Sequence, residues 1–435
     1  MTPNAQIDET GISERRLLAL VSAVQFVNIL DFMVVMPLGP DFSRELSVPL
    51  SHLGWIGGSY TAAAALAGLL SARFLDRFDR RTALAVTLLG LVIGTACGGL
   101  ATGMSSLMAA RILAGAFGGP ASALSLSIVA DVIPPARRGR ALGLVMAAFS
   151  VASVLGLPAG LELARLGGWR ATFFSVAALG LIVATCAVVL MPPLRLHLAP
   201  GAQPARPLAD ARPRSWAEHW REYHVSVLAL TATFTVMMAG FSLVPNMSAY
   251  VQGNLHYPRA QLGVLYLAGG AVSFLAVQAI GPVIDRLGAA FAATLGTISF
   301  VAVVGCAFVA EWPLPTPWIY VIFMSSMAVR NVSLGALSTR VPRAHERARF
   351  LSLQSAVQHA ASALGAVVSA QLLQERPDRT LAGMPKVGSF AIALALVLPL
   401  LLREIEQRVR AREAETIEDA LAAASVRTDA AEPTL

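Results

Sequence analysis

The chain has 435 residues, of which 56% are hydrophobic and only 14% are charged, and its mean hydropathy is +0.64. Soluble globular domains carry about 25% charged residues, so the composition excludes that class and indicates a membrane protein. The net charge of +7 comes almost entirely from arginines in short segments between apolar blocks, a placement that favours topology signals over nucleic-acid binding.

Twelve apolar segments are each long enough to cross a hydrocarbon core about 30 Å thick, which takes roughly 20 residues. The predicted spans are 17–39, 51–71, 82–102, 105–133, 141–163, 171–190, 224–247, 260–280, 291–310, 317–338, 350–372 and 386–403. The fold class is therefore an all-α polytopic membrane protein. The polar start at 1–16 resembles no cleavable signal peptide, so we expect the first span to act as the targeting signal.

A long polar stretch at 191–223 separates the spans into an N-terminal half, 17–190, and a C-terminal half, 224–403. Its Pro, Ala and Arg content is typical of a linker, and we expect a short surface helix around Trp216 to Trp220. The tail, 404–435, is polar; we expect a helical stretch to Ala424 and disorder beyond it.

The basic residues predict the orientation of the chain. With the N-terminus inside, the inside segments hold 24 Lys or Arg residues and the outside segments hold 7. Cytoplasmic loops carry the excess of Lys and Arg. Both termini and the linker are therefore predicted to lie in the cytoplasm, with the spans in a bacterial inner membrane.

The two halves resemble one another in sequence. Asp76 and Asp285 lie 209 residues apart in similar loops, and at the same spacing residues 140–156 align with 349–365 and Cys97 aligns with Cys306. A single offset for separate segments indicates two related halves in the same orientation. Transporters built in this way rock their halves about a site near the middle of the membrane. The three cysteines all lie in apolar segments and predict no disulfide framework.

Four motifs carry a resemblance to a known family. They are NILDFMVVMP at 28–37, ARFLDRFDRR at 72–81, RILAGAFGG at 111–119, and GLPAG at 156–160 followed by GGWRATF. In this order the chain resembles the major facilitator superfamily, specifically its twelve-helix drug:proton antiporter branch of bacterial multidrug and sugar-efflux permeases. Ala72, Asp79 and Leu157 stand where the family has Gly. The resemblance covers 17–403 and implies a major facilitator fold of two pseudo-symmetric six-helix halves.

The loop after the second span places Asp76 among four arginines. Such a cluster can form ion pairs in one conformation and release them in another, although plain positive-inside anchoring is the alternative. The resemblance implies that Asp76 faces a helix N-terminus of the second half and that Arg77 pairs with Asp131. The predicted gating residues are Asp76, Arg77, Arg80, Arg81, Asp131, Asp285 and Arg286.

Asp31 and Arg111 lie inside spans, where a charge costs about 2.5–3.5 kcal/mol on insertion scales and usually has a partner or a function. At 1.5 Å per residue, Asp31 lies about 9 Å and Arg111 about 10 Å below the outer face. The two side chains are therefore expected to meet. An Asp whose arginine partner comes and goes can load and release a proton; a permanent structural ion pair is the alternative.

Other polar side chains inside the spans are expected to face a cargo cavity, unless they form an interhelical hydrogen-bond network. The predicted cavity residues are Gln25, Asn28, Phe32, Asn246, Arg330, Asn331, Gln354 and Gln358. His359 and Glu162 are further candidates to carry the proton. Gly156, Pro158 and Gly160 are expected to kink the fifth span.

The sequence contains no GxSxG, HExxH, CxxC or P-loop pattern, which predicts neither an enzyme nor a metal or cofactor site and leaves an ion gradient as the energy source. We expect proton-coupled efflux, by antiport and alternating access, of a small amphipathic or hydrophobic compound. The expected partners of this monomer are the small-molecule substrate, protons and the lipid bilayer, with no nucleic acid. Uptake symport of a sugar or organic acid and a non-transporting receptor or scaffold are the alternatives.

Overall fold

The computed structural model describes residues 13–71, 77–194, 216–342 and 347–429. In the first half the elements are α1 (Glu14–Val35), α2 (Gly39–Leu46), η1 (Leu50–His52), α3 (Leu53–Ser71), α4 (Arg80–Gly99), α5 (Met104–Val132), α6 (Pro135–Met146), α7 (Ala148–Val151), η3 (Ala152–Gly156) and α8 (Leu157–Leu190). Local signals explain several boundaries, since Ser13 caps α1 with its side chain, Asp79 caps α4, and Pro135 stands in the first turn of α6.

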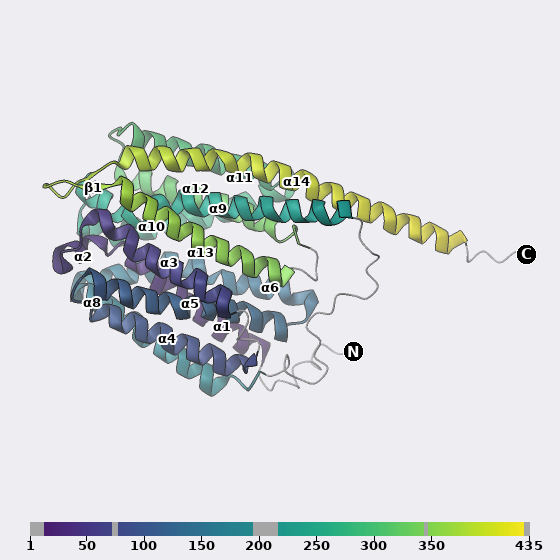
Figure 1. Cartoon of the computed structure of the whole chain (residues 1–435), viewed down its shortest axis with the longest axis horizontal. Coiled ribbons are helices and arrows are strands. Elements are labelled where there is room, and N and C mark those ends of the chain that lie inside the picture. The colour runs from purple at the N-terminus through teal and green to yellow at the C-terminus, as the bar shows by residue number, and fades with distance from the viewer. Residues whose placement is uncertain (1–12, 72–76, 195–215, 343–346, 430–435) are drawn as a thin grey trace, which may run out of the picture.

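The second half repeats this pattern of long helices. Its elements are α9 (Trp216–Gly253), η5 (Arg259–Gln261), α10 (Leu262–Leu287), α11 (Ala289–Val304), η6 (Gly305–Val309), α12 (Thr316–Ser338), α13 (Arg347–Leu372), β1 (Gln374–Glu375), β2 (Leu381–Ala382) and α14 (Met384–Asp429). Strands β1 and β2 form one short antiparallel hairpin. Figure 1 shows the first half in purple and blue beside the second half in teal, green and yellow.

The predicted twelve-helix architecture is confirmed. Ten stretches of the described residues are long and apolar enough to cross a membrane. The longest stretch, Arg140–Leu190, contains two membrane-spanning helices, because the positive φ of 77° at Gly168 interrupts α8. Helix α13 is not among these ten stretches because Gln354, Gln358 and His359 lower its mean hydropathy. It nevertheless packs against α3 and α9 as one helix of 26 residues.

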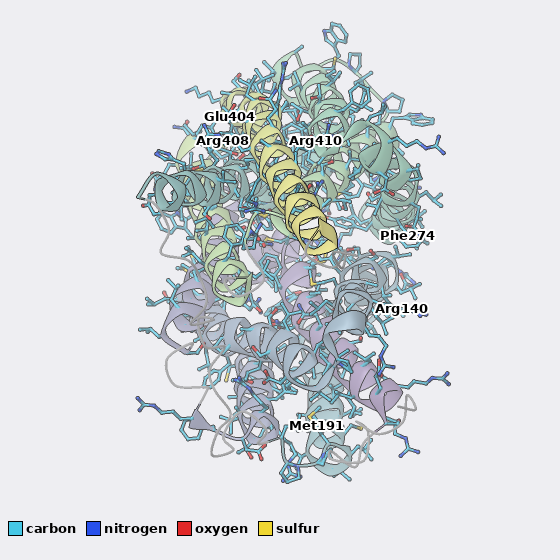
Figure 2. All side chains as sticks on the ribbon, turned by 90° about the vertical axis from the view of Figure 1, so that its right-hand side faces the viewer. Arg140, Met191, Phe274, Glu404, Arg408 and Arg410 are labelled. Carbon is cyan, nitrogen blue, oxygen red and sulfur yellow. The ribbon has the colours of Figure 1, made fainter. Side chains whose placement is uncertain are left out.

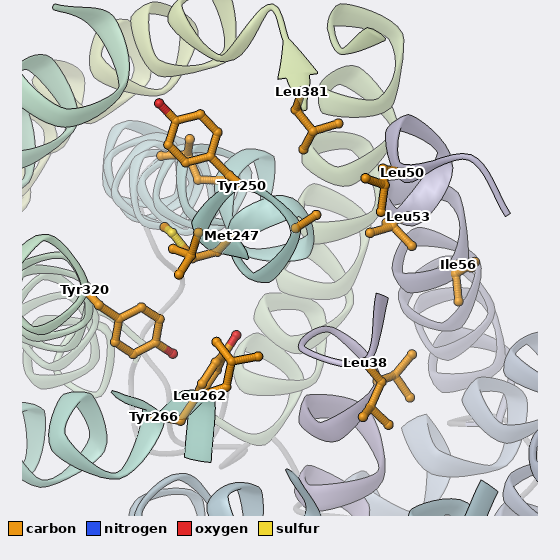
Figure 3. Packing of buried hydrophobic residues seen from close by; sticks show 14 of the residues in the cluster. Leu38, Leu50, Leu53, Ile56, Met247, Tyr250, Leu262, Tyr266, Tyr320 and Leu381 are labelled. Carbon is orange, nitrogen blue, oxygen red and sulfur yellow. The ribbon is translucent and has the colours of Figure 1, made fainter. Parts of the chain in front are cut away.

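Buried apolar side chains divide into clusters that reveal how the halves meet. One cluster joins both halves at the end of the bundle that carries α2, η1 and the β1–β2 hairpin, which we call the hairpin end. Figure 3 shows its members Leu38 and Leu53 of the first half near Met247 and Tyr266 of the second. Towards the opposite end, which we call the α14 end, each half has its own cluster.

The closest approach between the halves is made by α3 and α13. A Cβ on Gly54 would overlap the carbonyl oxygen of Ala366, so the two backbones touch where the chain has no side chain. Elements η3 and α8 also pack against α10. The halves are therefore held together by tight backbone packing as well as by the shared apolar cluster.

Two boundary predictions were wrong. The surface helix expected at Trp216 to Trp220 is the start of α9 and continues without a break into the seventh span, and α14 runs from the twelfth span to Asp429, past Ala424. Both stretches lack Gly and Pro near the predicted breaks, so nothing stops the helix. In Figure 1 the end of α14 projects beyond the bundle.

The first turns of the α14 extension are fixed to the second half. Ile405 and Val409 are buried in its apolar cluster, and Arg340 forms an ion pair with Glu413. This guanidinium holds the pKa of the Glu413 carboxyl below its ordinary range by hydrogen bonding to it. Figure 2 views this end of the molecule, where pairs of opposite charge one turn apart, such as Glu404 with Arg408, follow the exposed side of α14.

Candidate functional site

Asp31 of α1 and Arg111 of α5 meet inside the first half, as their estimated depths predict. Both side chains are 1% exposed. Arg111 Nη1 donates to Asp31 Oδ2 at 3.0 Å and to Oδ1 at 3.1 Å, while Nη2 donates to the Asp31 carbonyl oxygen at 3.3 Å. A buried pair of this kind holds only while both partners are charged, because removing either leaves the other uncompensated.

Two further side chains complete this pair, and the sequence analysis did not predict either. Thr95 of α4 donates its hydroxyl to Asp31 Oδ1 at 2.7 Å. The ring of Tyr60 of α3 lies 4.4 Å from the Arg111 guanidinium carbon. Four helices of the first half therefore contribute to one charged centre. Thr95 could have been found by the same depth estimate that joined Asp31 to Arg111, since it lies two turns, or about 10 Å, before the outer end of its predicted span.

The polar stripe predicted below Asp31 is a hydrogen-bonded seam between α1 and α5. Gln25 Nε2 donates to Ser122 Oγ at 2.9 Å, and Asn28 Nδ2 donates to the Gly118 carbonyl at 3.0 Å. The Tyr60 hydroxyl donates to Asn28 Oδ1 at 3.0 Å. These groups are buried and paired within one half, so in this conformation they join helices, as the network alternative expected.

Phe32 lies where the two halves face each other. Its ring stacks on Tyr60 at 5.3 Å and also contacts Phe241 of α9 at 5.7 Å, between ring centroids. The Phe32–Phe241 contact joins the first helices of the two halves. It therefore marks an apolar surface at the predicted position of the cavity.

The predicted cavity residues of the second half differ in their burial and hydrogen bonding. Asn246 is buried and donates to Ser369 Oγ at 2.6 Å, and Gln354 donates to the hydroxyls of Thr233 and Ser338. By contrast, Gln358 is exposed, and Asn331 and His359 are half-buried.

Arg330 does not line a space between the halves. It is 1% exposed, its Cγ lies beside Gly296 of α11, and its guanidinium carbon lies 4.4 Å from the centre of the Phe300 ring. The helix turns the side chain towards α11 and the interior of its own half. The prediction that Arg330 contacts the cavity is wrong for this conformation, because a position in the middle of a span does not determine which way the side chain faces.

The loop predicted as a gate is tied to its own half. Asp76 lies outside the described residues. Arg80 Nε pairs with Asp131 Oδ2 at 3.0 Å, while Arg77 is exposed, so the partner implied by the resemblance is wrong. Arg80 opens α4 and is turned inwards by the helix, whereas Arg77 precedes it in the loop. Arg81 donates to the Met191 carbonyl at 3.1 Å.

Two parts of the predicted gate remain, Asp79 in the first half and the corresponding pair Asp285 and Arg286 in the second. Asp79, which departs from the family's Gly, accepts hydrogen bonds from the backbone of Arg81 and of Leu194. It thereby fixes the start of α4 to the end of α8. Asp285 and Arg286 are both exposed at the end of α10.

The fifth span departs from a regular α-helix close to the predicted kink residues Gly156, Pro158 and Gly160. Element η3 is a π-helical turn directly before Pro158, which stands in the first turn of α8. Gly156 and Gly160 lie against Leu30 and Val34 of α1, where a Cβ would be crowded. The two glycines therefore let this span approach α1 closely.

Glu162, a further candidate to carry the proton, lies on the surface. Its carboxylate accepts from Arg165 Nε at 2.8 Å, and both side chains are about half exposed, at 52% and 46%. A solvated pair of this kind gives Glu162 no contact with the buried centre around Asp31.

A set of contacts that the sequence analysis missed closes the hairpin end. Arg259 Nη2 pairs with Asp41 Oδ2 at 2.6 Å, Ser248 Oγ donates to the Pro37 carbonyl at 2.9 Å, and the Leu50 amide donates to Glu375 Oε2 at 2.7 Å. Each joins one half to the other. Among the described residues, the hydrogen bonds and ion pairs between the halves all lie at this end, so the conformation is closed there. Asp41 and Arg259 both lie in segments predicted to be outside, but nothing in the sequence singles them out as partners among the other charges there.

Comparisons with known proteins agree with this architecture. The Major Facilitator Superfamily model matches residues 21–366. A chloramphenicol resistance protein of Streptomyces lividans is 27% identical over 310 residues, which cover 68% of this chain and 74% of that protein. A "probable actinorhodin transporter" of Streptomyces coelicolor is 27% identical over 259 residues, covering 59% and 40%. A puromycin resistance protein of Streptomyces alboniger is 30% identical over 166 residues, covering 38% and 33%.

Solved structures show the same fold at low identity. A D-xylose-proton symporter superposes with a TM-score of 0.70 at 16% identity, covering 88% of this chain and 97% of that one. A bacterial homologue of the human lysosomal transporter Spinster, inward-facing and unoccupied, superposes with a TM-score of 0.65 at 16% identity, covering 92% and 98%. The arrangement of the helices is shared across these proteins.

Proposed function

Because the chain belongs to the major facilitator superfamily, and is thus a multi-pass membrane transporter and not an enzyme, we propose that it exports a small amphipathic or hydrophobic compound in exchange for protons. The relatives named for chloramphenicol and puromycin resistance and for actinorhodin transport support export. Antiport and proton coupling are our proposal, and they rest on the site in the first half.

The observation that carries the proposal is the burial of Asp31. It is the one Asp or Glu in the middle of any of the twelve predicted spans, and it is 1% exposed beside Arg111 and Thr95. A buried carboxylate is a natural proton carrier, because a proton neutralises it and changes which partners it can hold. Protonated Asp31 no longer attracts Arg111 as an ion, so the contact between α1 and α5 weakens.

That weakening supplies a route from the proton to the movement of helices. Asp31 shares α1 with Asn28 and Gln25, which hold α5, and with Phe32, which contacts α9 of the other half. A shift of α1 against α5 therefore reaches the surface between the halves. We infer that proton binding and cargo binding exclude each other through this shift, as antiport requires.

The membrane orientation follows from the basic residues. The α14 end carries the arginine-rich segments, so we place it and both termini in the cytoplasm of a bacterial cell, with the transporter acting as a monomer in the inner membrane. The closed hairpin end then faces outwards. The described hydrogen bonds and ion pairs between the halves, all at that end, are those expected of an inward-facing conformation.

The chemistry of the surface between the halves supports an amphipathic cargo. Phe32 and Phe241 offer aromatic faces there, and we propose that the half-buried Asn331 and the exposed Gln358 offer hydrogen bonds on the same surface. A pocket of this composition holds a compound mainly by apolar contact and orients it with a few polar groups. Uptake symport of a sugar would require a denser set of free polar side chains.

The proposal is tested in everted membrane vesicles with an acidic lumen, monitored with a pH-sensitive dye. Addition of chloramphenicol or puromycin should release protons from the lumen in vesicles containing the transporter, and not in vesicles from cells without it. A panel of amphipathic antibiotics extends the test beyond these two. Vesicles that accumulate cargo without any proton release would exclude antiport.

A further inference from the structure

The second half contains a buried cation for which its helices provide no counter-ion. Arg330 of α12 is 1% exposed, and its Nε and Nη2 have no hydrogen-bond partner among the described residues. Its one described favourable contact is the face of the Phe300 ring, 4.4 Å from the guanidinium carbon. An unpaired charge in such a place is strongly destabilising, so a partner is expected.

The sequence excludes a carboxylate partner from the surrounding helices in any conformation. No Asp or Glu occurs in α11, α12 or α13, in α9 after Glu222, or in α14 before Glu404. Helix α10 contains Asp285, which is exposed at the α14 end. Rocking of rigid halves therefore cannot bring Arg330 an acidic side chain from its own bundle, which makes a bound anion the natural source of the compensating charge.

The unpaired atoms have the geometry of an anion site. Nε and Nη2 lie on the same edge of the guanidinium and form the fork that binds carboxylates with two parallel hydrogen bonds. On the facing helix α11, the hydroxyl of Thr297 is also buried without a partner among the described residues. In the sequence of α11, Thr297 follows Gly296 and stands one turn before Phe300, the two residues that Arg330 contacts.

Local packing holds the fork in this position. The stem of Arg330 crosses Gly296, where a Cβ would lie only 3.0 Å from Arg330 Cγ. A side chain at that position would push the arginine away from α11. The glycine and the aromatic ring therefore hold the guanidinium in place, and the unpartnered hydroxyl of Thr297 belongs to the same turn of α11.

We propose that Arg330 and Thr297 form a binding site for a monovalent anion, with the carboxylate as the ligand that matches the fork best. Water could fill the hydrogen bonds but would leave the charge uncompensated. The anion is either free in solution or the acidic group of a larger compound. This site is independent of proton coupling at Asp31, since it lies in the other half and contains no titrating acid.

The test is thermal unfolding of the purified full-length transporter in detergent, with sodium formate, sodium chloride, sodium benzoate and neutral benzamide as probes. A ligand that binds the folded state raises the Tm in a saturable way, here by roughly 2–4 °C. We expect this rise in the parent and in Arg403→Gln, a control that loses an exposed arginine of the same half. It should be absent in Arg330→Met.

The pattern of responses identifies the source of the anion. Arg330-dependent stabilisation by formate or chloride supports the site with a free anion as its ligand. Stabilisation by benzoate alone, and not by benzamide, supports it with the acidic group of a larger compound. Arg330→Lys keeps the charge without the fork, so it should lose the preference for formate over chloride; this variant decides the matter if Arg330→Met does not fold.

Equal responses of the parent and Arg330→Met to every anion would mean simple screening and would overturn the proposal. So would equal stabilisation by benzoate and benzamide. Because the assay involves neither a gradient nor cargo flux, its outcome does not depend on whether the proposed antiport is correct.

Discussion

The two halves each bury one arginine in the middle of the membrane, but they compensate it differently. In the first half Arg111 has Asp31, with Thr95 on the same carboxylate. In the second half Arg330 has an aromatic ring and no acid. We propose the first centre, which contains a carboxylate, as the proton carrier, and the second, which has a permanent charge, as a site for an anion. Under these two proposals the related halves have separate tasks.

The largest expected effect comes from unbalancing the first centre. Arg111→Gln leaves Asp31 buried without its counter-ion, which should cost about 3–5 kcal/mol of stability. Adding Asp31→Asn removes the orphaned charge, so the double variant should recover most of that loss while remaining inactive in transport. Thermal unfolding of the three proteins measures this, with Arg403→Gln as the control. A double variant no more stable than Arg111→Gln would mean that the two charges do not compensate each other.

A smaller effect is expected at the hairpin end, where Asp41 and Arg259 join the halves. This pair is 11% and 22% exposed, and its loss in Arg259→Gln should shift the conformational balance by about 1 kcal/mol, or roughly fivefold. The shift should favour opening at that end. Ile56→Cys, in a chain without its three native cysteines, reports opening by its labelling rate with an impermeant maleimide.

Arg44→Gln is the matched control for this experiment, since Arg44 pairs with the same Asp41 but within the first half. The labelling rate should change little in that variant. Equal acceleration by both variants would show that the pair between the halves has no special role in closing the hairpin end.

The gating loop should respond to one arginine more than to its neighbour. Arg80→Gln removes the ion pair with Asp131, whereas Arg77 is exposed. Transport at matched membrane levels should therefore fall a few-fold in Arg80→Gln and stay near the parent rate in Arg77→Gln. The reverse order would restore the pairing of Arg77 that the family resemblance implied.

The smallest effect is expected for the α14 extension. Arg340 and Glu413 are 44% and 43% exposed, so solvent screens their attraction. Arg340→Gln should lower the free energy of unfolding by less than about 1 kcal/mol and leave transport unchanged. Thermal unfolding beside a transport assay measures both. A large loss of transport would indicate that the extension takes part in the transport cycle.

The sequence predicted features that depend on periodicity and depth. Apolar segments predicted the twelve rods, and counting residues from the span ends predicted that Asp31 meets Arg111. It did not predict which way Arg330 faces. The rotation of a helix about its own axis depends on packing, and a span that is apolar on all sides gives no sign of which side faces the interior.

Contacts between distant segments were also beyond the sequence. The Asp41–Arg259 pair depends on how the two halves dock in one conformation. That Arg80, and not Arg77, pairs with Asp131 depends on the residue at which α4 begins. Helix ends were misplaced where good helix formers continue past a change in polarity, as in α9 and α14.

The most direct test of the account is gradient-driven transport by Asp31→Asn in proteoliposomes. The variant keeps the shape of the side chain but cannot carry a proton. We expect cargo binding to survive in part and the response to an imposed pH gradient to disappear, with Arg403→Gln responding like the parent. If Asp31→Asn follows the gradient at the parent rate, the proton is carried elsewhere and the proposed role of Asp31 is wrong.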